Sequence, residues 1–251
     1  MPSSEQQWEE IIRGFESKWQ FPNACGAMDG KHVNVRCPPH SGSEFFNYKK
    51  TFSSILFAVV DAYNNFLYID VGTNGRVNDA HVFSKSAFAA LESGALKVPT
   101  RVVFLGDDAF PLRTNLLKPY SRCGPLTVTQ RIFNYRLSRA RRVVENAFGI
   151  LVARFCIFEK PIPLKLTTTE LVVKTCCALH NWLRRSSLLR ESDDRTFLLT
   201  PRDQPPRAGL SDLAGTDLSN RTYRREAGRV RDHFANRFVT TDTLSWQLDR
   251  I

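Results

Sequence analysis

The chain has 251 residues, of which 42% are hydrophobic and 24% are charged. This ordinary globular composition excludes a wholly disordered or collagen-like chain, and the length is enough to bury a substantial core. No apolar run approaches the roughly 20 residues that a membrane span needs, and the polar, acidic N-terminus lacks the pattern of a secretory signal. We therefore expect one large domain with appendages and no membrane segment.

Positive charge is concentrated in one part of the sequence. The formal net charge is +10. Residues 121–185 contain twelve Lys or Arg and only three Asp or Glu, which accounts for nearly the whole excess. Such a basic block is typical of a protein that binds a polyanion. On charge alone, a solvated helix face explains it equally well.

Hydrophobic periodicity predicts a chain in which most strands precede the long helices. Ser4 and Gln7 fit a capping box at the start of an amphipathic helix, and Asp29-Gly30 is typical of a tight turn or a strand end. The predicted elements are, in chain order, a helix over 4–19, strands over 24–28, 32–36, 53–63 and 66–71, a helix over 78–90, a strand over 101–106, a short helix over 112–117, and helices over 133–155, 167–185 and 220–238. This order predicts a mixed sheet flanked by helices, an α/β core.

The composition changes towards the C-terminus. Residues 187–218 are polar and contain several Pro and Asp, which predicts a flexible loop or linker. We therefore divide the chain into an N-terminal helix over 1–22 that leads into the core, a core domain over 23–186, this linker, and a C-terminal helical segment over 219–251.

Three acidic residues are candidates for a metal site. Asp29 and Asp107 each follow a predicted strand, and Glu145 lies on a strongly basic helix. Sites in α/β proteins assemble at strand ends, and carboxylate oxygens are the ligands that Mg²⁺ prefers. Each residue also has a purely structural explanation. Asp29 suits a turn, Asp107 or Asp108 suits a helix cap, and Glu145 is spaced to pair with Arg141.

Other polar residues are weaker candidates. The six cysteines form no C-x-x-C pair, so the sequence signals neither a zinc ribbon nor a redox motif, and we expect reduced thiols. Cys176 and His180 have a spacing that suits a metal, but core packing is the favoured interpretation. His32 and His40 are expected to be structural or solvated, and Asp79 is expected to cap a helix.

Several ordered blocks of the sequence resemble the PIF/Harbinger transposase family, a DDE-type nuclease group that includes Harbinger-derived nucleases and ALP1-like proteins. The first catalytic block of the family resembles Gly26-Ala27-Met28-Asp29-Gly30-Lys31-His32, and the third resembles the segment around Val144-Glu145-Asn146. The matching blocks are residues 26–32, 46–50, 53–61, 70–83, 105–112, 133–149, 178–181 and 246–247. Together they cover residues 8–185 well and the remainder loosely.

The resemblance implies an RNase H-like fold, with a mixed five-stranded sheet flanked by helices and extra C-terminal helices. It implies that Asp29, Asp107 and Glu145 are the catalytic acids and hold Mg²⁺ or Mn²⁺. Asp107 takes the family's catalytic position because it directly follows Leu-Gly, and Asp108 is the alternative. The implied reaction is hydrolysis of DNA phosphodiesters by a two-metal mechanism, with strand transfer in a transposase.

Partners and location follow from the same resemblance. We expect DNA to bind with Arg139, Arg141 and Arg142 on its phosphates. We also expect a Myb-like DNA-binding partner protein, a homo-oligomer, and a location in the nucleus, with the cytoplasm as a second site. Family members commonly carry an N-terminal helix-turn-helix region, whereas this sequence begins almost at the core. This indicates a fragment, a truncated gene model or a domesticated copy. The alternative function is a domesticated, non-catalytic nuclear DNA-binding or scaffold protein of the same fold.

Overall fold

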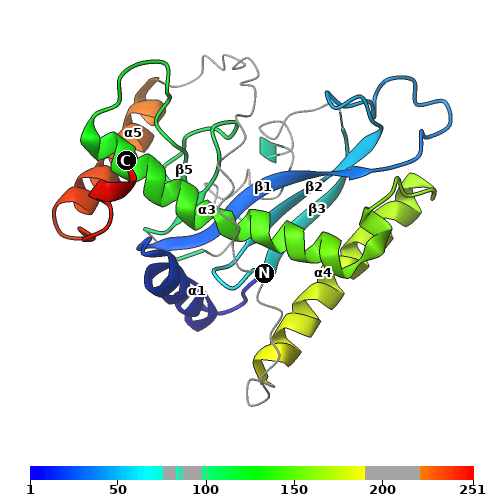
Figure 1. Cartoon of the computed structure of the whole chain (residues 1–251), viewed down its shortest axis with the longest axis horizontal. Coiled ribbons are helices and arrows are strands. Elements are labelled where there is room, and N and C mark those ends of the chain that lie inside the picture. The colour runs from blue at the N-terminus through cyan, green and yellow to red at the C-terminus, as the bar shows by residue number, and fades with distance from the viewer. Residues whose placement is uncertain (76–82, 85, 87–97, 100, 190–220) are drawn as a thin grey trace.

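The computed structural model describes residues 1–75, 83–84, 86, 98–99, 101–189 and 221–251. Five strands form one mixed sheet in the order β3-β2-β1-β4-β5, and helices pack around it (Figure 1). The elements are α1 (Glu5–Trp19), β1 (Ala24–Asn34), β2 (Ser53–Val60), β3 (Phe66–Asn74), β4 (Val103–Leu105), β5 (Leu116–Leu117), α3 (Val128–Arg154), η2 (Cys156–Phe158), α4 (Leu166–Leu189), α5 (Arg221–Val239) and η3 (Leu248–Arg250). The predicted α/β class and five-stranded mixed sheet are confirmed.

The central strand, β1, differs from its prediction. It is antiparallel to β2 and parallel to β4, and it runs without a break through Asp29 and Gly30. Asp29 pairs with Ala58 and Gly30 pairs with Phe57, so the predicted turn or strand end at this point is wrong. Pairing with a distant strand explains the extended backbone at Asp29 and Gly30. β2 is buried along its whole length and pairs with β1 on both sides of the Asp-Gly dipeptide, which overrides the local turn preference.

Two further predictions differ in detail. The short helix predicted over 112–117 is wrong, because Leu116–Leu117 is strand β5, which pairs in parallel with β4. α3 begins five residues earlier than predicted, where Thr127 and Gln130 form a capping box. The predicted helix over 78–90 and the linker over 187–218 lie mostly outside the described residues.

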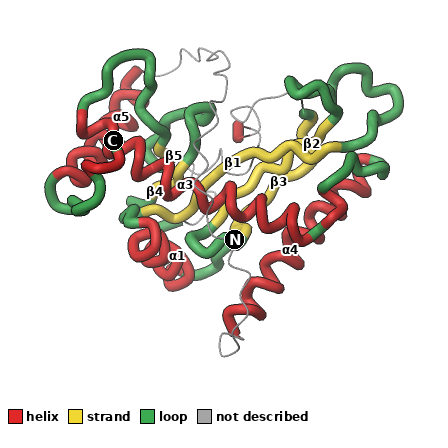
Figure 2. The backbone as a smooth tube through the Cα atoms, in the orientation of Figure 1, coloured by secondary structure: helices red, strands yellow, loops and turns green. Residues whose placement is uncertain are grey.

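The helices close the core on the sheet. α3 crosses in front of the strands in Figure 1, and its buried residues include Val144, Ala147 and Leu151. α1 begins at the predicted cap, where the Ser4 hydroxyl accepts a hydrogen bond from the Gln7 backbone N–H. The loop that joins β1 to β2 projects beyond the end of the sheet (Figure 2). Within the described residues, no helix combines the length and the apolar character that crossing a membrane requires.

Candidate active site

Asp29 and Asp107 occupy matching positions beside two parallel strands. Ala27 of β1 is in register with Leu105 of β4, and each acid lies two residues beyond its member of this pair. Asp29 is therefore inside β1, whereas Asp107 comes just after β4 ends. Parallel strands bring the residues that follow them to the same edge of a sheet, so the fold places both carboxylates in one region.

Glu145 is linked to this region by ion pairs of Arg141 with Glu145 and with Asp29. One nitrogen of the Arg141 guanidinium lies 3.7 Å from the Asp29 carboxylate and 3.6 Å from the Glu145 carboxylate. Arg141 and Glu145 are four residues apart on α3, so they share one face of the helix. The Arg141 side chain is largely buried, whereas that of Glu145 is 58% exposed. Two of the three predicted acids, Asp29 from β1 and Glu145 from α3, therefore lie beside the Arg141 guanidinium.

The adjacent acids Asp107 and Asp108 have different surroundings. The Asp107 carboxylate accepts a hydrogen bond of 2.9 Å from the Ala109 backbone N–H. The Asp108 carboxylate lies 3.2 Å from the Lys118 ammonium, which also donates to the Asp108 carbonyl oxygen at 2.6 Å. Asp108 is mostly exposed and is paired with a cation. Asp107, which follows β4 at the position that corresponds to Asp29 on β1, is therefore better placed to share a site with it.

The donor chemistry of Asp29, Asp107 and Glu145 suits a hard divalent cation, because all three supply carboxylate oxygens. Across the described residues, however, no three His, Cys, Asp or Glu side chains are arranged as a ready-made metal site. Arg141 lies between two of the acids, so a metal ion that binds both must displace its guanidinium. The residues fit Mg²⁺ or Mn²⁺ in the chemistry of their oxygens, and Asp29 and Asp107 fit also in their positions beside neighbouring parallel strands.

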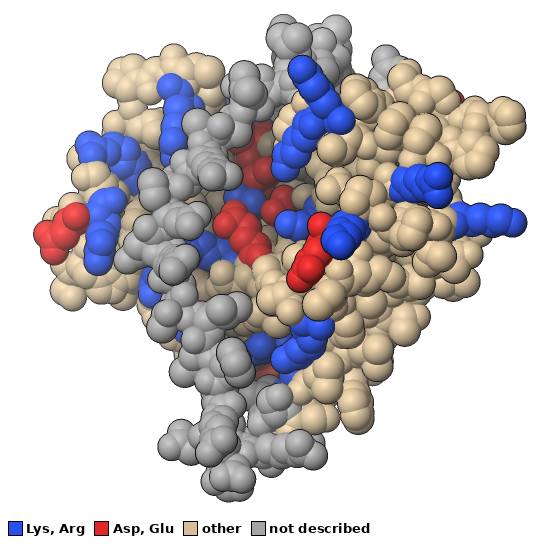
Figure 3. Space-filling view, turned by 45° about the vertical axis from the view of Figure 1, so that its right-hand side comes forward, with Lys and Arg blue, Asp and Glu red and all other residues tan. Residues whose placement is uncertain are grey.

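The three predicted phosphate-binding arginines have different environments. Arg139 donates to the Gln20 side chain and lies over the Trp246 ring, 4.7 Å from its centroid. Burial lowers the pKa of Arg139. Arg142 is exposed, and Arg141 contacts the acids. Figure 3 shows acidic side chains gathered near the middle of one face, with Lys and Arg side chains around them.

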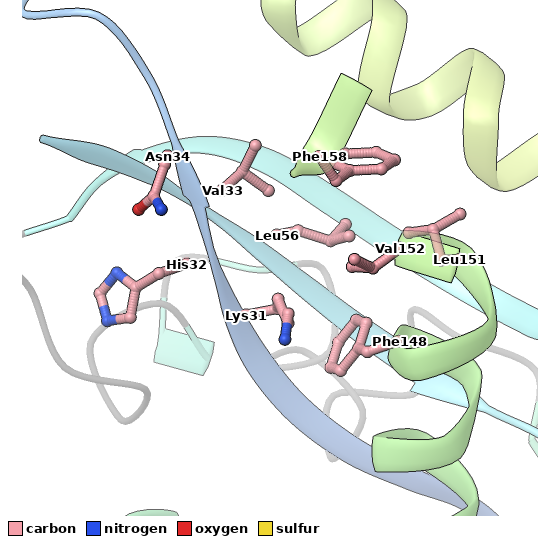
Figure 4. Close-up of a pocket in the computed structure, with 9 residues that line it drawn as sticks. All are labelled: Lys31, His32, Val33, Asn34, Leu56, Phe148, Leu151, Val152 and Phe158. Carbon is pink, nitrogen blue, oxygen red and sulfur yellow. The ribbon is translucent and has the colours of Figure 1, made fainter. Parts of the chain in front are cut away.

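A small cavity of about 40 Å³ lies between β1 and the C-terminal part of α3 (Figure 4). It is close to the size that holds a single water molecule, so it has no room for a nucleotide. Lys31 points from β1 towards Phe148 in this cavity, whereas His32 leaves the strand on the opposite side. Burial and, to a smaller extent, the charge of Lys49 lower the pKa of Lys31, while Asp29 opposes the shift.

The weaker candidates are structural where the structure describes them. His180 is fully buried, and its Nε2–H donates to the Asn64 carbonyl oxygen at 2.8 Å. The ring also packs against Phe66, so the prediction of core packing for this helix is confirmed. His32 is hydrogen-bonded to the Ser53 hydroxyl at 2.9 Å. Asp79 lies outside the described residues.

Buried His180 predicts a loss of stability in mild acid. Burial is the main cause that lowers the pKa of His180 to about 4. The unfolded chain takes up this proton near pH 6.5, and the folded protein takes it up only near pH 4. The free energy of unfolding should therefore fall as the pH drops from about 6.5 to 4, by up to about 3 kcal/mol from this residue.

The measurement is urea unfolding at a series of pH values, for the wild type and for His180→Gln. Glutamine keeps an N–H donor for the Asn64 carbonyl oxygen but does not titrate. The variant should have a flatter dependence on pH between 4 and 6.5. Equal slopes for the two proteins would mean that His180 is not held neutral by the fold.

The sequence predicted the pairing of Arg141 with Glu145 from their four-residue spacing, and the structure contains it. It carried no signal for the second contact of Arg141, with Asp29, because that contact joins α3 to a distant strand. Residues 46–50 were noted only as part of the family resemblance. The exposed Tyr48 among basic residues was the signal that could have marked this loop.

Comparison with known proteins places the chain in a family. A family model described as DDE superfamily endonuclease matches residues 28–181. "Protein ALP1-like" of Arabidopsis thaliana is 30% identical, over 96% of this chain and 57% of its own length. "Putative nuclease HARBI1" of Rattus norvegicus is 26% identical, over 93% of this chain and 65% of its own length. No solved structure matches the chain.

The match covers the segment that carries the site. Residues 28–181 include Asp29, Asp107 and Glu145, together with β1 from Met28 onwards, the other four strands and helix α3. The chain spans less than two thirds of the length of the two relatives named above. The fold, the family model and the relatives agree with the resemblance found in the sequence, and the chain belongs to the DDE superfamily endonucleases of the Harbinger-derived type.

Proposed function

We propose that the protein is a metal-dependent DNA nuclease that hydrolyses phosphodiesters with Asp29, Asp107 and Glu145. The observation that carries this proposal is the matching position of Asp29 and Asp107 beside parallel strands, with Glu145 joined to Asp29 through Arg141. Acids that come from three separate elements of an α/β fold and meet beside cations are the arrangement that phosphoryl transfer requires. Family membership supports a nuclease-like enzyme.

Each residue has a distinct part in this mechanism. The three carboxylates would hold Mg²⁺ or Mn²⁺, and the chemistry such an ion would supply is activation of a water and stabilisation of the leaving oxygen. Asp29 is fixed by its place within β1, and its carboxylate accepts a hydrogen bond from the Gly30 N–H at 3.0 Å. Arg141, released from the acids, is placed to neutralise a phosphate that approaches them. Exposed Arg142 contacts the DNA backbone farther along α3.

The test is cleavage of labelled DNA in Mg²⁺ or Mn²⁺ by the wild type and by Glu145→Gln. Glutamine keeps the shape of the side chain and removes the charge that a metal needs. Loss of a group that only supports a metal ligand costs about 10–100-fold, so the loss of a ligand should lower cleavage more than about 100-fold. DNA binding should be retained, because Glu145 is acidic and 58% exposed.

One feature of the site favours a second function. Arg141 satisfies both Asp29 and Glu145, as it would if the acids only stabilised the fold. Under this alternative the protein is a domesticated nuclear DNA-binding or scaffold protein without cleavage. Absence of cleavage by the wild type with either metal, and with a Myb-like partner present, would favour it. A homo-oligomer and a nuclear location are part of both proposals.

A further inference from the structure

We propose that the loop between β1 and β2 is a binding site for single-stranded DNA, in which an unpaired base stacks on Tyr48 and the adjoining phosphate contacts Lys49. This inference rests on the proposed function, since it takes DNA as the ligand of the protein. It goes beyond that function, because it assigns a substrate contact to residues outside the acidic site.

The loop is held in one shape by buried hydrogen bonds. The side chain of Asn47 is 3% exposed, and its oxygen accepts from the backbone N–H groups of Lys49 at 2.9 Å and Thr51 at 3.1 Å. Its amide nitrogen donates to the Ser53 hydroxyl at 2.8 Å, which ties the turn to the start of β2. Lys50 has a positive φ of 61°, an unusual conformation for a lysine that the surrounding bonds maintain. The loop therefore presents its side chains in a preorganised arrangement.

Tyr48 projects from this turn into solvent. Its residue exposure is 74%, the largest among the exposed large hydrophobic residues of the described part. The ring packs edge-on against His32, with 5.6 Å between the centroids, and the Lys49 ammonium lies 5.5 Å from the centroid of the Tyr48 ring. His32 is itself anchored by its bond to Ser53. An oriented and exposed aromatic ring beside a cation is the combination on which bases of a single strand stack.

Positive charge lies beside Tyr48. Lys49 is next to Tyr48 in the chain and its ammonium lies near the Tyr48 ring. Burial and, after it, the charge of Lys49 lower the pKa of His32, the residue on which Tyr48 packs. No carboxylate of the described residues is in an ion pair with Lys49 or Lys50. Phosphates are the groups that would neutralise these lysines.

The ring favours an unpaired base over a duplex. A stacking platform needs access to the face of a base, which a base pair within a duplex does not offer. Lysines by themselves bind phosphates of either form, so they do not discriminate between the two. Tyr48 should therefore add affinity for a single strand alone, whereas Lys49 should add affinity for both forms.

The experiment measures fluorescence anisotropy of a labelled single strand and of a duplex of equal length, in EDTA. Tyr48→Ala should weaken binding of the single strand by about 10-fold, which lies within the range measured for loss of one stacked base, and change duplex binding by less than about 2-fold. Tyr48→Phe should bind as the wild type does. Lys49→Gln should weaken both complexes and lower the salt dependence by about one phosphate contact.

Lys18→Gln is the matched control. Lys18 also lies over a tyrosine, with its ammonium 4.0 Å from the centroid of the Tyr63 ring, but it is on α1. Lys18→Gln should leave the affinities for the single strand and for the duplex unchanged. Equal binding of the single strand by Tyr48→Ala and the wild type, or an equal loss for strand and duplex, would overturn the inference. Because no cleavage is measured, a protein that binds through Tyr48 but never cuts DNA would contradict only the proposed function.

Discussion

Asp107→Asn is expected to lower metal-dependent DNA cleavage by more than about 100-fold, whereas Asp108→Asn should keep it within about 3-fold of the wild type. The two substitutions are chemically identical and one residue apart. Asp107 and Asp29 each lie two residues beyond the paired residues Leu105 and Ala27 of the parallel strands β4 and β1, which places the Asp107 carboxylate in the region of the candidate site. Asp108 is exposed and paired with Lys118, and exposed ion pairs contribute little to stability.

The comparison is made as initial cleavage rates in Mg²⁺ and Mn²⁺, with thermal unfolding of each variant as the control for folding. Asparagine at position 107 still accepts a hydrogen bond from the Ala109 N–H, so the local turn should persist. The reverse result, with cleavage lost in Asp108→Asn and kept in Asp107→Asn, would assign the site to the alternative acid. Equal losses would show that the segment after β4 matters only as a whole.

The sheet was largely predictable because its signal is local. Apolar runs of strand length mark β2, β3 and β4, and the structure places strands in all three regions. Asp29-Gly30 was not predictable from its neighbours. Turn preference is a local property, whereas the extended backbone there depends on pairing with Ala58 and Phe57, nearly thirty residues away in the chain.

The candidate site was predictable in its acids but not in its cations. Strand ends and family blocks point to the acids, while the partner of each arginine depends on packing between distant segments. Arg139 is engaged by Gln20 and Trp246, and Arg141 by Asp29. The sequence alone presents these arginines as equivalent members of one basic block. Long-range contacts separate them into structural and site residues.

Arg136 is the clearest example of a structural arginine in that block, and its loss should have a large effect on stability. The residue is 2% exposed, and its guanidinium donates to the carbonyl oxygens of Gln20 and Asp242. It also lies 3.8 Å from the centroid of the Phe238 ring. Burial lowers the pKa of Arg136 to about 10, so the group remains charged at neutral pH.

Arg136→Met is therefore expected to lower the free energy of unfolding by about 3–5 kcal/mol, because two partly buried carbonyl groups lose a charged donor and the contact with Phe238 loses its charge. Urea unfolding measures this difference, and Arg142→Met is the control. Arg142 lies on the same helix but is exposed, so the same substitution there should change stability by less than about 0.5 kcal/mol.

Hydrogen exchange should locate the loss in Arg136→Met. Gln20 ends α1, Phe238 lies near the end of α5, and Asp242 follows α5, so the arginine joins the N-terminal and C-terminal segments of the chain. Amide protons of α5 should exchange faster in this variant, while those of β1 and β2 should change less. Equal stability of Arg136→Met and Arg142→Met would instead mean that the stacked rings of Phe133 and Phe238 hold α5 on the core without the arginine.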